Sequence, residues 1–124
     1  MSNLLLTVPM LHVANMRSAL DVYCDRLGFI KTSEYRPHSD VEDPAYVILQ
    51  RDETGLHLSS FPGDGRPGGV AVIFVDDVDA LHREFAGRGV EVGLEPVDQS
   101  WGNREMYIGD PDGNQLRYTQ PRAS

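Results

Sequence analysis

The stretch Val13-Ala14-Asn15-Met16 recurs about 62 residues later as Val75-Asp76-Asp77-Val78. In each copy an apolar run ends at an Asn or Asp, residue types preferred as helix N-caps, and a helical pattern follows. A glycine ends each helical pattern, Gly28 in the first copy and Gly89 in the second. Because the same signals occur twice in the same order, the sequence predicts two copies of one structural module.

Each copy is read as a strand, a helix and three further strands. In the first copy we expect strands at about 4–13, 29–36, 45–51 and 56–61 and a helix at 16–27. In the second we expect strands at 70–75, 91–94, 104–109 and 115–119 and a helix at 78–88. The breaker-rich segment 62–69 connects them. The sequence therefore predicts an α+β fold in a single domain, 1–124, with two βαβββ modules at about 1–61 and 70–121. The modules would be related by a pseudo-twofold axis, with the strands curled into an open cup and the helices outside.

Side chains along the expected strands alternate between two faces. An apolar set suits packing under the helices and consists of Leu56, Leu58, Ala71, Ile73, Val75, Leu116 and Tyr118. The opposite set is polar or aromatic and suits the lining of a solvated cup. It consists of Tyr46, His57, Ser59, Phe61, Glu105, Tyr107, Gln115, Arg117 and Thr119.

Charge and composition exclude several classes of partner. The 124 residues carry a formal net charge of −8 and a pI near 4.8, which opposes binding to nucleic acids and anionic membranes. No apolar run approaches the roughly 20 residues of a membrane span, and residues 1–7 lack the features of a secretory signal. The single cysteine, Cys24, permits no intramolecular disulfide. We therefore expect a cytoplasmic protein with no nucleic-acid or membrane partner.

Three segments carry a resemblance to a known family. They are 8–29, the stretch Val75-Asp76-Asp77-Val78-Asp79-Ala80-Leu81, and Trp101-Gly102-Asn103-Arg104-Glu105 leading into Asp110-Pro111-Asp112-Gly113-Asn114. In this order they resemble the vicinal oxygen chelate superfamily of glyoxalases, bleomycin resistance proteins and dioxygenases. They are most similar to its bleomycin resistance protein branch.

The enzymes of that superfamily hold one divalent metal on four cup-facing positions. The resemblance places these positions at Val8, His57, Val70 and Arg117. A metal needs three or four N, O or S donors, and arginine is not a usable donor because it stays protonated. Only His57 could bind a metal, so we expect no metal, no other cofactor and no catalytic residue.

The bleomycin resistance branch implies a homodimer that binds an antibiotic in grooves built from both chains. Pro9 matches the proline at which the N-terminal strand of that branch crosses to the partner subunit; the alternative is an edge-strand proline without exchange. Trp101 matches an aromatic residue that packs on a flat ligand. It lies in an expected loop, which favours a ligand platform over a core tryptophan.

Several cup residues keep two interpretations. Tyr46, Phe61 and Tyr107 form either an aromatic clamp or ordinary cross-strand contacts. His57 either contacts the ligand or is structural. Arg117 is expected to pair with Glu105, because a guanidinium in a cup is costly without a partner; a contact to a ligand anion is the alternative. Acidic loop residues near the cup mouth favour a cationic ligand or are simply solvated: Asp40, Glu42, Asp43, Asp52 and Glu53.

Three functions remain open from the sequence. The first is metal-free binding of a small molecule, cationic or polyaromatic, that confers antibiotic resistance by sequestration. The second is a metal-dependent lyase, isomerase or dioxygenase of the same superfamily. The third is a small-molecule carrier or sensor with no resistance role. The ligand set missing from the expected metal positions favours the first and third over the second.

Overall fold

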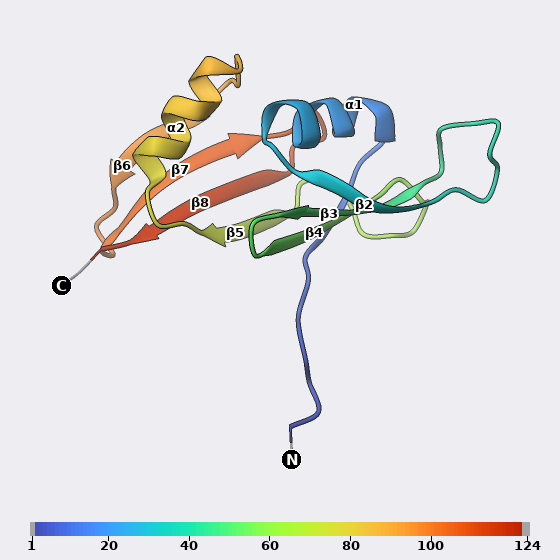
Figure 1. Ribbon diagram of the computed structural model, residues 1–124, viewed down its shortest axis with the longest axis horizontal. Coiled ribbons are helices and arrows are strands. Elements are labelled where there is room, and N and C mark those ends of the chain that lie inside the picture. Colours follow the sequence, from blue (N-terminus) through green and yellow to red (C-terminus); the bar gives the residue numbers. More distant parts are fainter. Residues whose placement is uncertain (1, 123–124) are drawn as a thin grey trace.

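The computed structural model describes residues 2–122 and contains two four-stranded sheets with helices on one side (Figure 1). The first module comprises β1 (Met10–His12), α1 (Met16–Leu20), the π-helical η1 (Asp21–Arg26), β2 (Ile30–Tyr35), β3 (Tyr46–Arg51) and β4 (Thr54–Ser59). The second comprises β5 (Val70–Phe74), α2 (Val78–Gly87), β6 (Leu94–Asp98), β7 (Asn103–Gly109) and β8 (Gln115–Pro121). The predicted α+β fold of two βαβββ modules is confirmed.

The two sheets repeat one topology. Their strand orders are β1-β4-β3-β2 and β5-β8-β7-β6, so the first and last strands of each module are neighbours. These neighbours run parallel, with Met10 opposite His57 in one sheet and Val72 opposite Arg117 in the other. The remaining pairs are antiparallel. The sheets do not join into a closed barrel.

The helix ends follow the signals read from the sequence. The Asn15 side chain accepts a hydrogen bond from the Ser18 amide at 2.9 Å, and Asp77 accepts one from the Ala80 amide at 3.0 Å. Gly28 has a φ of +81°, and a Cβ there would lie 2.7 Å from Nη1 of Arg51. The positive φ therefore favours glycine at this helix end, and a Cβ would also force the Arg51 guanidinium to shift.

The core lies between the helices and the sheets. The apolar set expected there is buried, except that Val75 is only partly covered. The helices contribute Tyr23 and Phe85, both fully buried and 62 positions apart, so they are equivalent residues of the two modules. Side chains on the opposite side of both sheets form what we call the open face.

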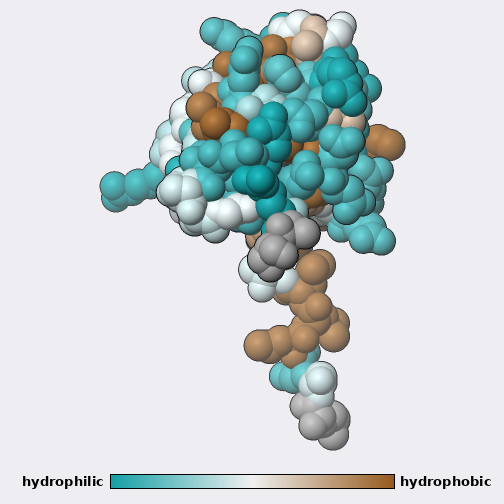
Figure 2. Space-filling view, turned by 90° about the vertical axis from the view of Figure 1, so that its left-hand side faces the viewer, coloured by the Kyte–Doolittle hydropathy of each residue, from teal (hydrophilic) through white to brown (hydrophobic). Residues whose placement is uncertain are grey.

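The first strand is shorter than expected. It begins at Met10, because Pro9 has no amide hydrogen to continue the ladder and only its carbonyl bonds, accepting from the His57 amide at 3.0 Å. Residues 2–8 form an arm that leaves the body on the side away from the helices (Figure 1). Leu4, Leu5 and Leu6 on this arm are 94%, 94% and 82% exposed, and the arm stands clear as an apolar projection (Figure 2).

The strand expected at 91–94 was also placed wrongly. It is found as β6, Leu94–Asp98, which includes Pro96. The edge of a sheet tolerates proline, and β6 pairs only with β7, with a register shift between Leu94 and Val97. No helix within residues 2–122 is long and apolar enough to cross a membrane.

Candidate functional site

A cluster of polar and aromatic side chains on the open face of the second module centres on Glu105. This carboxylate is 6% exposed and lies on β7. Trp101 donates its indole N–H to Oε2 of Glu105 at 3.0 Å, and the Tyr107 hydroxyl donates to Oε1 at 2.7 Å. Both carboxylate oxygens are therefore used to hold aromatic side chains. We call this group, with Arg117, the tryptophan cluster.

Glu105 is charged in spite of its burial. Burial by itself would raise the pKa of Glu105, but hydrogen bonds from Tyr107, Trp101 and Asn103 and the positive charge of Arg117 outweigh it and hold the pKa below the usual range. The hydrogen bond between Tyr107 and Glu105 raises the pKa of the Tyr107 hydroxyl, and burial is a second cause. The tyrosine therefore stays a neutral donor and the glutamate an anion.

The expected ion pair between Arg117 and Glu105 is wrong. Arg117 instead donates from Nε to the Gln115 side chain at 2.7 Å, and its guanidinium lies 4.8 Å from the ring centroid of Tyr107. Glu105 has no salt bridge among the residues described, because Trp101 and Tyr107 occupy its oxygens. Tyr107 therefore contacts both charges, the Arg117 guanidinium through its ring and the Glu105 carboxylate through its hydroxyl.

Trp101 has the exposure expected of a ligand platform. Its side chain is 62% exposed although its N–H is hydrogen-bonded, so the core alternative is wrong. The adjacent Gly102 has a φ of +105°, a backbone conformation that allows the turn between β6 and β7. The indole is therefore fixed at one edge and presents its surface to solvent.

A second cluster lies on the open face of the first module. The Tyr46 hydroxyl and Nδ1 of His57 are 2.7 Å apart, and their rings meet edge to face at 5.4 Å. Ser59, fully buried, donates to the Asp64 carboxylate at 2.8 Å and accepts from the Phe61 amide at 3.1 Å. We call this group the histidine cluster. His57 contacts Tyr46 through Nδ1, as a structural histidine would. Its Nε2 has no hydrogen bond within residues 2–122 and is available to a ligand.

Asp64, a member of the histidine cluster, and Tyr35, which contacts its Phe61, were missed from the sequence. Tyr35 stacks on Phe61, with ring centroids 6.0 Å apart and planes within 5°. Asp64 comes from the connector, and its backbone carbonyl also meets Nδ1 of His12 at 3.0 Å. Tyr35 could have been found, since it faces Tyr46 in the β2–β3 register. Nothing in the glycine-rich connector distinguished Asp64.

The tryptophan and histidine clusters are separate within one chain. Among residues 2–122, none of the hydrogen bonds, ion pairs or aromatic contacts links a member of one cluster to a member of the other. The edge strand β5 presents Val70, Val72 and Phe74 on the open face, 50%, 54% and 67% exposed. Each module therefore carries its own polar and aromatic cluster, and β5 adds exposed apolar side chains to the open face.

The residues at the expected metal positions do not fit a metal. Val8 and Val70 offer no donor atom, Arg117 is engaged with Gln115 and Tyr107, and Nδ1 of His57 is used by Tyr46. Within the described part of the chain, no three His, Cys, Asp or Glu side chains come together in a way that could hold a metal ion. The donor set of the metal-dependent superfamily members is not present at these positions.

The fold and the two clusters define an α+β protein that presents aromatic and charged side chains on the open face of paired βαβββ modules. The chain belongs to the glyoxalase superfamily, since the family model described as "Glyoxalase superfamily protein" matches residues 3–123. The resemblance read from the sequence is confirmed.

Relatives and solved structures agree with this assignment. The chain is 25% identical to the bleomycin resistance protein of Geobacillus stearothermophilus, over 94% of this chain and 97% of the relative. It is similar to a bleomycin-binding protein from bleomycin-producing Streptomyces verticillus complexed with copper(II)-bleomycin, with a TM-score of 0.72, 26% identity and full coverage of both chains. It is also similar to an antibiotic binding protein from Streptomyces sp. CB03234, with a TM-score of 0.70 and 25% identity over 97% of this chain and 99% of that one.

Proposed function

We propose that this protein binds an antibiotic without altering it and confers resistance by sequestration. The observation that carries the proposal is the Trp101 indole, 62% exposed yet fixed through its N–H to the buried Glu105. A fixed flat ring contributes stacking area to a ligand at little conformational cost. The curated and structural relatives that bind bleomycin or another antibiotic support the same function.

The ligand contacts are assigned to both clusters. Trp101 stacks on a planar part of the ligand, while Glu105, Tyr107 and Arg117 fix the platform and supply polar contacts. Tyr46, His57, Ser59 and Phe61 line the opposing half-site. Because the protein has a net charge of −8, a cationic ligand such as a bleomycin-type glycopeptide would be attracted at long range.

The alternative, a metal-dependent enzyme of the superfamily, has less support. The valines at positions 8 and 70 provide no donor atoms, and the arginine at position 117 provides none either. We therefore propose that binding requires no metal held by the protein and involves no catalytic residue. A ligand that carries its own metal remains compatible with this proposal.

We further propose a homodimer with exchanged N-terminal arms. The arm lies directly before Pro9 and exposes Leu4, Leu5 and Leu6, whose apolar side chains would be stabilised by burial against a partner. The exposed edge of β5, with Val70, Val72 and Phe74, offers an apolar surface of the same kind. A second copy would cover both surfaces and bring the histidine cluster of one chain to the tryptophan cluster of the other. We place this dimer in the cytoplasm.

Calorimetry against a panel of metal-free bleomycin and polyaromatic natural products tests the function. We expect one panel member to bind with one ligand per chain, to be recovered with unchanged mass, and to bind equally well after the protein has been treated with a chelator. Added salt should weaken the binding of a cationic ligand. Conversion of the ligand, or one protein-bound metal per chain whose removal abolishes binding, would contradict the proposal.

Sedimentation tests the dimer separately. The wild-type chain should sediment at twice 13.8 kDa. A variant with Leu4, Leu5 and Leu6 replaced by serine should form a weaker dimer, which dissociates at a higher protein concentration than the wild type does. The matched control is Val41→Ser, which removes an exposed apolar side chain from a loop outside the arm. A wild-type protein that is monomeric and still binds ligand would contradict both the exchange of the N-terminal arms and the ligand site shared between two chains.

A further inference from the structure

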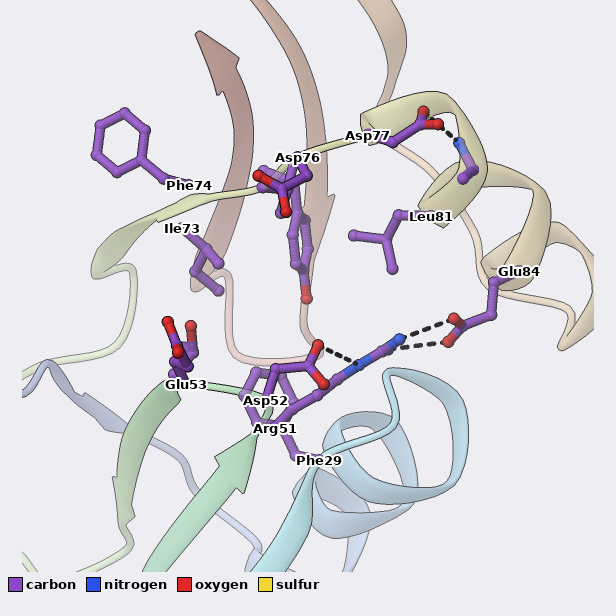
Figure 3. A pocket seen from close by; sticks show the side chains of 14 residues that line it. Phe29, Arg51, Asp52, Glu53, Ile73, Phe74, Asp76, Asp77, Leu81 and Glu84 are labelled. Carbon is purple, nitrogen blue, oxygen red and sulfur yellow. Dashed lines mark hydrogen bonds and ion pairs between the residues drawn. The ribbon is translucent and has the colours of Figure 1, made fainter.

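A cleft of about 720 Å³ lies on the helix side of the protein, away from both clusters. It is bounded by the β3–β4 turn, the end of β5 and helix α2, so it forms where the two modules meet (Figure 3). None of its lining residues belongs to the tryptophan or histidine cluster. Its volume falls in the range of pockets that hold small molecules.

Three carboxylates line this cleft without a strong partner of their own. Glu53 and Asp76 form no salt bridge within the described residues. Asp52 has one weak contact, at 3.9 Å from Nε of Arg51, and its side chain is 90% exposed. The other acidic residues of the cleft are engaged. Asp77 caps α2, and Glu84 accepts two hydrogen bonds from Arg51 at 2.7 and 2.8 Å. The cleft therefore has a negative rim.

The cleft also has an apolar part, beside which one buried polar atom has no partner among the described residues. Ile73 and Leu81 point into it from different elements (Figure 3). Tyr118 also lines it, is 4% exposed, and has a hydroxyl with no hydrogen-bond partner within residues 2–122. Buried hydroxyls are usually paired, because an unpaired one loses its hydration without compensation. A polar group of a bound molecule would satisfy it.

We propose that this cleft is a second binding site, for a small organic cation that carries an ammonium group on an apolar or aromatic body. The ammonium lies at the negative rim that Asp52, Glu53 and Asp76 form, the body packs on Ile73 and Leu81, and a polar group at the far end meets the Tyr118 hydroxyl. The three carboxylates do not converge as a metal site would require, which favours an organic cation over a metal ion. This site is independent of the antibiotic site proposed above.

Titration of the ¹⁵N-labelled full chain with 2-phenylethylamine tests the rim by NMR. We expect saturable shifts confined to the amides of 52–54 and 74–77, and about tenfold weaker binding of the neutral 2-phenylethanol. The double variant Glu53→Gln with Asp76→Asn should weaken amine binding about fivefold. The control Glu95→Gln, an exposed glutamate outside the cleft, should leave it unchanged. Equal affinity for amine and alcohol, shifts centred on the open face, or no saturable binding would overturn the site.

A second pair of probes tests the interior. Tyramine adds a phenol hydroxyl to 2-phenylethylamine and should bind about fivefold more tightly, through a hydrogen bond to the Tyr118 hydroxyl. In Tyr118→Phe the two amines should bind equally, while the variant folds normally because it loses only an unpartnered group. A preference for tyramine that survives in Tyr118→Phe, or no preference in the wild type, would contradict the placement of the ligand against Tyr118. Trp101→Ala should change none of these affinities.

Discussion

The two junctions where a helix of one module meets the β-hairpin turn of the other are built differently. At the first, the β7–β8 turn Asp110–Asn114 fills the space under α1 and η1. Asp110 accepts a hydrogen bond from the buried Tyr23 hydroxyl at 2.9 Å, and Asp112 accepts one from the Ala14 amide at 3.0 Å. At the second, the short β3–β4 turn Asp52-Glu53 leaves a cleft beside α2, and the Tyr118 hydroxyl has no partner in the part of the chain that the structure describes.

The difference shows which parts of the repeat are free to change. Both modules keep the capped helix, the glycine at its end and the buried aromatic at Tyr23 or Phe85. The hairpin turns differ in length, since the β3–β4 turn is Asp52-Glu53 and the β7–β8 turn is Asp110–Asn114. The longer turn reaches the helix of the neighbouring module through hydrogen bonds to Tyr23 and Ala14. The repeat therefore specifies the fold, and departures from the repeat create the surfaces available to ligands.

The largest expected effect is at the filled junction. Asn114 is fully buried, accepts from the amides of Gly68 and Gly69, and donates to the His12 carbonyl at 2.8 Å. Asn114→Ala would leave these backbone groups unpaired and should lower the free energy of unfolding by about 2–4 kcal/mol in urea titrations. Glu53→Ala in the other turn should change it by less than about 0.5 kcal/mol. Similar losses in both variants would mean that the two junctions do not differ as described.

A pair of tyrosine variants sharpens the comparison. Tyr23→Phe removes a buried hydrogen bond to a carboxylate and should destabilise the protein by about 1.5–2 kcal/mol. Tyr118→Phe removes a hydroxyl without a partner and should leave the stability unchanged or slightly higher. Thermal or chemical denaturation of the two variants side by side is sufficient. A large loss in Tyr118→Phe would show that its hydroxyl has a partner in the folded protein.

The smallest effect concerns the Arg51–Glu84 ion pair at the second junction, beside the cleft. Hydrogen bonds from Arg51 hold the pKa of Glu84 below its ordinary value of 4.5, in spite of partial burial. Because the pKa is lower in the folded state, the ionised group stabilises the protein above about pH 4.5, and this contribution is lost as the pH falls through the folded-state pKa. Glu84→Gln should cost about 0.5–1 kcal/mol at pH 7 and make the decline of stability in acid less steep. If stability depends on pH in the same way in Glu84→Gln and in the wild type, the Arg51–Glu84 ion pair does not contribute to stability as proposed.

The fold was predictable because its determinants are local and occur twice. The caps Asn15 and Asp77, the terminating glycines and the period-2 alternation of the strands are each readable from a few neighbouring residues. The errors fell where long-range pairing decides. β1 begins at Met10 because Pro9 cannot donate to the ladder with β4, and Pro96 is accepted in β6 because that strand lies at a sheet edge.

The candidate site was predictable by face but not by partner. Alternation placed Glu105, Tyr107 and Arg117 on one face of the second sheet. It could not show that Trp101, from a loop, would take an oxygen of Glu105 and leave Arg117 to stack on Tyr107. Asp64 was missed for the same reason. Asp52 and Glu53, expected near the cup mouth, instead line the cleft on the helix side. Contacts between loops and strands depend on tertiary geometry that no short pattern encodes.

The central claim is that an antibiotic binds on the open face against Trp101, and calorimetry on the tightest-binding compound of the panel tests it most directly. Trp101→Ala should lower the affinity by about 1–3 kcal/mol, as expected for a buried aromatic anchor, with stability unchanged. Val41→Ala, which removes an exposed apolar side chain elsewhere, should not change the affinity. Since Trp101 is the only tryptophan, ligand binding should also change the intrinsic fluorescence of the wild-type protein. An affinity that is the same in wild type and Trp101→Ala would contradict the proposed site.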